Sequence, residues 1–193
     1  TKPTKMETLI ALSLISVALL SSCNNQTKEQ KEVANETIAA TTPETTTDEK
    51  ASVQKFVAGY LDLKNALAND NAIDAESAAN AMMATMSGLD ESGFTANQKK
   101  VYDAVKEDAR ENVEHIAENA KDIDHQREHF EMLSGDIYDL VKAFGSEKPL
   151  YKDYCPMYNN KNGAFWLSET KEIKNPYMGK LMSSCGKVQE ETK

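Results

Sequence analysis

Apolar residues recur at intervals of three and four positions through four successive segments between residues 51 and 145. This spacing is the period of one face of an α-helix, and no alternating strand pattern competes with it over the same stretch. Short polar or glycine-containing stretches separate the segments, so consecutive helices must turn back on one another. The spacing therefore predicts an all-α fold, an antiparallel four-helix bundle over residues 51–145.

Capping residues and apolar stripes predict the limits and the core of this bundle. The expected helix ends are Thr47 or Asp48 before the first helix, Thr95 before the third, Asp122 or Asp124 before the fourth, and Gly145 after it. The positions expected in the core are Phe56, Tyr60, Leu63, Leu67, Met82, Val101, Val105, Phe130, Leu133, Ile137 and Val141.

Residues 146–193 differ in character, because aromatic and turn-forming residues replace the helical pattern. The stretches "YCPMY" and "AFWLS" flank Asn162-Gly163, a common turn pair. We expect an irregular segment with a small β-hairpin that packs on the bundle, with Trp166 as a packing anchor.

The start of the chain has the features of an exported lipoprotein. Lys2 and Lys5 precede an apolar run that is too short to span a bilayer, and Leu20-Ser21-Ser22-Cys23 follows, which resembles a lipobox. We expect a lipoprotein signal peptide over residues 1–22, lipidation of Cys23 and a lipid-anchored flexible tether over residues 23–50. The expected location is the outer membrane, facing the periplasm.

The charge of the chain narrows the class of function. The formal net charge is −9, and removal of the signal peptide, which carries a net +1, leaves −10. Such a field does not attract nucleic acid. No phosphate-binding glycine pattern and no hydrolase triad is evident, so we expect a protein that is not an enzyme.

Cys155 and Cys185 are the two cysteines left after lipidation, and two interpretations of them stay open. One is a disulfide that staples the C-terminal segment. The other is a soft-metal site for Cu(I), in which the thioethers of Met157, Met178 and Met182 assist the two thiolates. Both require the two cysteines to lie close together.

His125 and His129 are four residues apart and therefore share a helix face, where they could bind a metal, with His129 also a candidate ligand beside the cysteines. The alternative is that His129 and Arg127 flank the core stripe and hydrogen-bond to neighbouring groups. "HQREH" also fits the H-x-x-E-H pattern of zinc peptidases, but a domain this small offers neither the distant third ligand nor the substrate cleft. His115 is expected to be a solvated or partly buried helix residue.

The segments "HQREHFEMLSGDIYDLVKAFG" and "YCPMYNNKNGAFWLSETKEIKNPYMGK", with a closing Cys-Gly, resemble the domain of unknown function 3347 family over roughly residues 55–190. The resemblance implies a helical domain in bacterial secreted proteins and lipoproteins, also fused to membrane-fusion subunits of heavy-metal efflux pumps. Relatives have a histidine before Cys-Pro-Met, where this chain has Tyr154.

These observations predict a lipid-anchored periplasmic binding protein that captures or buffers a soft metal such as Cu(I), with metal-efflux components as expected partners. The alternative is a disulfide-stapled helical interaction module of an envelope or efflux complex that holds no metal.

Overall fold

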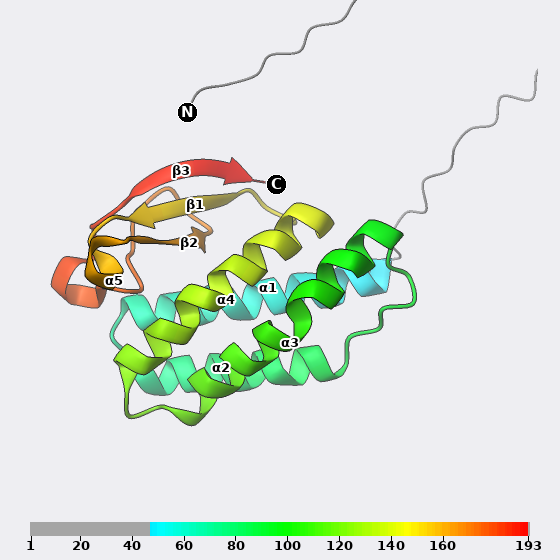
Figure 1. Cartoon of the computed structure of the whole chain (residues 1–193), viewed down its shortest axis with the longest axis horizontal. Coiled ribbons are helices and arrows are strands. Elements are labelled where there is room, and N and C mark those ends of the chain that lie inside the picture. The colour runs from blue at the N-terminus through cyan, green and yellow to red at the C-terminus, as the bar shows by residue number, and fades with distance from the viewer. Residues whose placement is uncertain (1–46, 193) are drawn as a thin grey trace, which may run out of the picture. The chain divides into compact units, whose positions relative to one another are not determined.

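The computed structural model describes residues 47–192, and within them four long helices form the larger part of the fold (Figure 1). These helices are α1 (Thr47–Ala68), α2 (Ala72–Ser87), α3 (Ala96–Glu118) and α4 (Ile123–Phe144). α1 packs on α2, α2 on α3, α3 on α4, and α4 on α1. The predicted four-helix arrangement is therefore confirmed.

The start of α3 and both ends of α4 lie where the capping residues predict them, whereas α1 already includes Thr47 and Asp48. Thr95 and Gln98 form a reciprocal capping box at the start of α3, and Asp122 caps α4 by accepting a hydrogen bond from the His125 N–H. Gly145, with φ of 72°, ends α4. These local hydrogen bonds satisfy backbone groups that have no partner inside a helix.

The core follows the predicted stripes. Of the positions expected in it, all are buried except Val101, which is partly exposed and packs against the core from outside. The rings of Tyr60 and Phe130 stack with centroids 5.0 Å apart at the centre of the bundle. The Tyr60 hydroxyl also accepts a hydrogen bond from the Leu167 N–H and so joins the bundle to the C-terminal segment.

That segment forms a three-stranded antiparallel sheet of β1 (Leu150–Cys155), β2 (Ala164–Ser168) and β3 (Lys187–Thr192), in the order β2-β1-β3. The predicted hairpin corresponds to β1 and β2, which are joined by the short turn α5 (Tyr158–Lys161). The all-α prediction is too narrow, because it has no place for β3. This edge strand is mostly exposed and is held by backbone pairing with β1, so its sequence lacks apolar alternation.

Arg127 connects the start of α4 to two distant parts of the chain. Its guanidinium donates to the carbonyls of Leu67 and Pro176 and forms an ion pair with Asp70 at 2.6 Å. The short 3-10 turn η1 (Gly179–Met182) follows Pro176. Only 8% of Arg127 is exposed, so this prediction of a flanking, hydrogen-bonded arginine is confirmed.

No helix among residues 47–192 is long and apolar enough to cross a membrane. The expected signal peptide over residues 1–22, the lipidation site Cys23 and most of the predicted tether lie outside the described residues.

Candidate metal centre and cysteine pair

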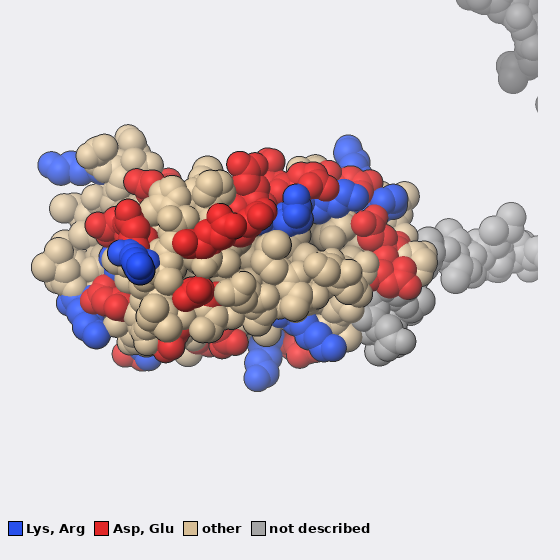
Figure 2. Space-filling view, turned by 90° about the horizontal axis from the view of Figure 1, so that it is seen from below, with Lys and Arg blue, Asp and Glu red and all other residues tan. Residues whose placement is uncertain are grey.

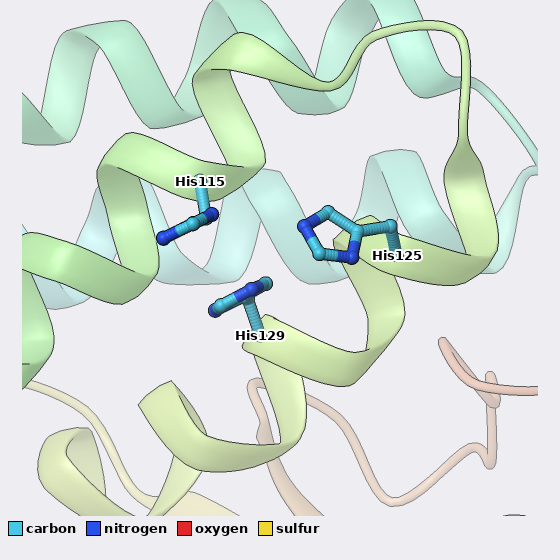
Figure 3. Close-up of side chains that lie close together, drawn as sticks. All are labelled: His115, His125 and His129. Atoms are coloured by element: carbon cyan, nitrogen blue, oxygen red, sulfur yellow. The ribbon is translucent and has the colours of Figure 1, made fainter.

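Three histidine side chains converge where α3 ends and α4 begins (Figure 3). His115 lies in the last turn of α3, and His125 and His129 occupy the first two turns of α4. Because a short link joins these antiparallel helices, the end of α3 faces the start of α4. One ring nitrogen from each histidine lies within 4.8 Å of the other two.

The spacing of the three imidazole rings approaches the spacing of ligands around one metal ion. The ring centroids of His115 and His129 are 4.2 Å apart, and those of His125 and His129 are 4.7 Å apart. Nitrogen atoms bound to one tetrahedral Zn²⁺ lie about 3.4 Å from each other. A bound ion would therefore require the three ring nitrogens to move closer together, and all three side chains are partly exposed.

Asn112, one turn before His115 on α3, holds His129 in position. Its Oδ1 lies 2.9 Å from His129 Nδ1, and because an amide oxygen can only accept, His129 Nδ1 carries the proton. The second ring nitrogen, Nε2, then keeps its lone pair. The Asn112 side chain is also hydrogen-bonded to Asp136, which fixes the orientation of the amide. Such outer contacts orient metal-binding histidines in many proteins.

The electrostatics of the cluster favour a neutral His129. Burial, followed by the nearby rings of His115 and His125, lowers the pKa of His129 below its ordinary value, although Glu128 and Glu111 oppose this. A neutral imidazole is the form that binds a metal. Glu111 lies 4.0 Å from His115 and Glu128 lies 3.5 Å from His125. These two carboxylates favour a cation beside the cluster. Acidic side chains also form a band across one face of the molecule (Figure 2).

Cys155 and Cys185 form a second group of potential ligands. Cys155 ends β1, Cys185 precedes β3, and the pairing of these strands brings the two Sγ atoms to 2.8 Å, with both cysteines free. Their predicted proximity is confirmed. Gly186 is required beside them, because a Cβ there would lie 3.0 Å from the Trp166 ring and 3.1 Å from the Tyr154 carbonyl.

The two thiols have different environments. Burial raises the pKa of Cys155, but hydrogen bonds from Cys185, from the N–H groups of Met157 and Tyr158 and from Asn175 outweigh it, so the pKa lies below its ordinary value. Burial, together with the neighbouring Cys155, raises the pKa of Cys185 to about 11. Of the pair, Cys155 is therefore the thiol that more readily becomes a thiolate.

The predicted methionine ligands are placed less favourably. Met157 reaches the cysteine pair through its backbone N–H, while 46% of the residue is exposed. Met182, in η1, is 38% exposed, and Met178 is partly buried against the core. His129 faces Asn112 of α3 and the other histidines, so the structure groups it with them.

The sequence prediction identified two of the three histidines and missed the contribution of His115. The positions of His115 and His125 on either side of the link between α3 and α4 could have indicated that His115 joins the cluster. In an antiparallel hairpin, residues at similar distances before and after the link face each other. His115 lies three residues before the end of α3, and His125 lies two residues after the start of α4.

Comparison with known proteins concerns mainly the bundle. Searches of curated proteins and of solved structures gave no match. A protein-family model described as "Protein of unknown function (DUF3347)" matches residues 56–149, which contain all three histidines, whereas Cys155 and Cys185 lie beyond the match. Through residues 56–149, this chain belongs to the DUF3347 family.

Proposed function

We propose that this protein binds a transition-metal ion through His115, His125 and His129. The observation that carries the proposal is the convergence of one ring nitrogen from each histidine within 4.8 Å. Two supports are independent of this distance: the contact from Asn112 that leaves His129 Nε2 unprotonated, and the carboxylates of Glu111 and Glu128 beside the cluster.

The donor set indicates which ions the site would select. Imidazole nitrogens suit Zn²⁺, Cu²⁺ and Ni²⁺, whereas Mg²⁺ and Ca²⁺ prefer oxygen ligands. Three protein ligands leave a fourth position for water or for a donor from another molecule. An open position of this kind suits capture and release of an ion, because a second protein can add a ligand before the first ones dissociate.

Metal titration of the full chain tests this proposal. The chain would carry Cys23→Ser, Cys155→Ser and Cys185→Ser, so that thiols contribute no ligand. We expect one equivalent of Zn²⁺ or Cu²⁺ to bind by isothermal titration calorimetry, with the site lost in the variant that also carries His115→Gln, His125→Gln and His129→Gln.

A matched control keeps the comparison specific. Met132→Gln introduces the same residue on an exposed position of α4 and should leave the affinity unchanged. Circular dichroism would confirm that each variant retains its helices. Equal binding by the triple-histidine variant and the control would contradict the proposal.

A second candidate is Cu(I) at Cys155 and Cys185. The specific observation in its favour is the contact between the two Sγ atoms, together with the hydrogen bonds that favour a thiolate at Cys155. Cu(I) accepts thiolate and thioether ligands at low coordination number. Competition with a Cu(I) chelator would test it under reducing conditions, and we expect weaker copper retention in Cys155→Ser and, to a smaller degree, in Met157→Leu. Equal copper retention by the unsubstituted chain and by both variants would exclude this site.

The proposal includes the location at which the protein binds metal. Lipidation of Cys23 would hold the protein on the periplasmic face of the outer membrane, where it could pass metal to efflux components. Intact-mass analysis should find a mature chain that begins at Cys23 and carries acyl groups. If neither site binds a metal, the alternative of a helical interaction module of an envelope or efflux complex would be preferred.

A further inference from the structure

The cysteine pair differs from a purely structural disulfide in how its two sulfur atoms can be reached. Cys155 is fully buried, whereas Cys185 is partly exposed and follows an exposed stretch that includes Leu181 and Met182. A thiol from another molecule can therefore approach Cys185 but not Cys155. Since the two Sγ atoms are already in contact, a bond between them can form without rearrangement of β1 or β3.

The buried sulfur is surrounded by hydrogen-bond donors. The N–H groups of Met157 and Tyr158 and the side chain of Asn175 donate to Cys155 Sγ. These donors would stabilise negative charge on this sulfur when a bond to it breaks. Cys155 Sγ, the buried sulfur, is therefore the one suited to leave as a thiolate when another thiol attacks Cys185.

Asn175 is rigidly held for this role. It is fully buried, and its Oδ1 accepts hydrogen bonds from the N–H groups of Tyr177 and Met178 at 2.8 and 3.0 Å. Its Nδ2 also donates to the Cys185 carbonyl at 2.7 Å. One side chain thus fixes the turn that carries Cys185 and contacts the sulfur of Cys155.

We propose that Cys155 and Cys185 form an exchangeable disulfide that reacts with dithiols through Cys185. A thiolate of the dithiol attacks Cys185 Sγ, the bond between the cysteines breaks, and its electron pair stays on Cys155 Sγ. The second thiol of the dithiol, after loss of its proton, attacks the mixed disulfide at its own first sulfur. Cys185 leaves as a thiolate and takes up a proton, so the protein disulfide is reduced and the dithiol becomes a disulfide.

This activity is separate from metal binding at the histidines, and it shares its thiols with the second candidate, the Cu(I) site. The disulfide form cannot supply thiolates to Cu(I), so the tests are made with a chelator present. A failure of exchange would therefore leave the proposal for the three histidines untouched.

The first test compares the two sulfurs in full chains that carry Cys23→Ser. One chain also carries Cys155→Ser and keeps Cys185, and the other carries Cys185→Ser and keeps Cys155. With oxidised glutathione as the probe, mass spectrometry should show the mixed disulfide forming at Cys185 at least about 100-fold faster, because Cys155 is buried. An equal or faster reaction at Cys155 would overturn the proposal.

The second test measures the equilibrium between the disulfide and the dithiol in glutathione buffers, using the Cys23→Ser chain. We expect the folded protein to exchange without denaturant. Asn175→Ala should shift the equilibrium about tenfold toward the disulfide, because the reduced form loses a donor to Cys155. The control Asn80→Ala removes an exposed side-chain hydrogen bond on α2, far in sequence from both cysteines, and should shift nothing. A disulfide that opens only on unfolding would refute exchange, and the rate comparison remains decisive if Asn175→Ala fails to fold.

Discussion

The imidazole of His115 stacks on that of His129, with ring centroids 4.2 Å apart and ring planes 3° from parallel. Two rings this close cannot both carry a positive charge without strong repulsion. Burial and the neighbouring rings lower the pKa of His129, and a neutral imidazole is the form that binds a metal ion. A proton and a metal ion compete for this cluster.

The first prediction concerns stability and pH. Because the folded protein lowers the pKa of His129, the unfolded chain binds a proton more readily. The stability that the protein gains from holding His129 neutral is therefore fully present above the unfolded pKa of histidine, about 6.5. It is lost as the pH falls below that value toward the folded pKa. Urea unfolding of the metal-free protein between pH 5 and 8 should show a smaller loss of stability at low pH in His129→Gln. Identical pH profiles would show that this histidine does not contribute.

The second prediction concerns the support of the metal centre. Asn112→Leu removes the acceptor that orients His129 while all three proposed ligands remain. We expect Zn²⁺ affinity to fall about 10- to 100-fold with the stoichiometry unchanged. Glu114→Gln, on an exposed position of α3, serves as the control for a neighbouring polar change. An unchanged affinity in Asn112→Leu would mean that the amide has no part in binding.

The third prediction concerns Asp153, a fully buried residue of β1. Neither of its carboxylate oxygens has a hydrogen-bond partner among the described residues, and burial raises its pKa to about 7 despite the nearby Lys64. The folded protein therefore gains stability as the pH falls through 7 toward the unfolded value near 4, and its charged form destabilises the fold above pH 7. Asp153→Asn should increase the free energy of unfolding at pH 8 by about 1–3 kcal/mol.

The gain in Asp153→Asn should shrink as the pH approaches 5, where the native carboxyl is already protonated. Chemical denaturation at both pH values would measure the difference. If Asp153→Asn is less stable than the native chain at pH 8, the buried carboxylate of Asp153 does not destabilise the fold.

The fourth prediction concerns the core. Phe130 is fully buried and contacts both Tyr60 in α1 and Tyr177 in the C-terminal segment. Phe130→Ala should lower the free energy of unfolding by about 3–5 kcal/mol, because it leaves a cavity where the bundle meets the sheet. Met132→Ala, two residues away and half exposed, should change it by less than about 1 kcal/mol. Similar losses in the two variants would place the centre of the core elsewhere.

The helices could be predicted because their information is local. Apolar spacing and caps such as Thr95, Asp122 and Gly145 act within a few residues, and the structure uses each of them. β3 could not be predicted in this way, since its place depends on backbone pairing with β1 and on contacts of Glu190 with Tyr138 and Lys142 in α4. Sequence spacing alone has no access to such distant partners.

The candidate sites show the same division. The pair His125 and His129 is visible as a four-residue spacing on one helix, while His115 joins them only through the packing of α3 on α4. The approach of Cys155 to Cys185 could be expected from their number, but the difference in their environments could not. Asn175, ten residues before Cys185, contributes to that difference, and nothing in its local sequence indicates a contact with a sulfur atom.

Arg127 lies between His125 and His129 in sequence and points to the other side of α4, where it binds the carbonyls of Leu67 and Pro176. A fluctuation that unwinds the first two turns of α4 must therefore separate the histidines and release the C-terminal segment in one event. An ion held at the histidines would make that fluctuation rarer. Amide hydrogen exchange in the segment around Pro176 would then slow on metal binding, although no atom of that segment touches the ion.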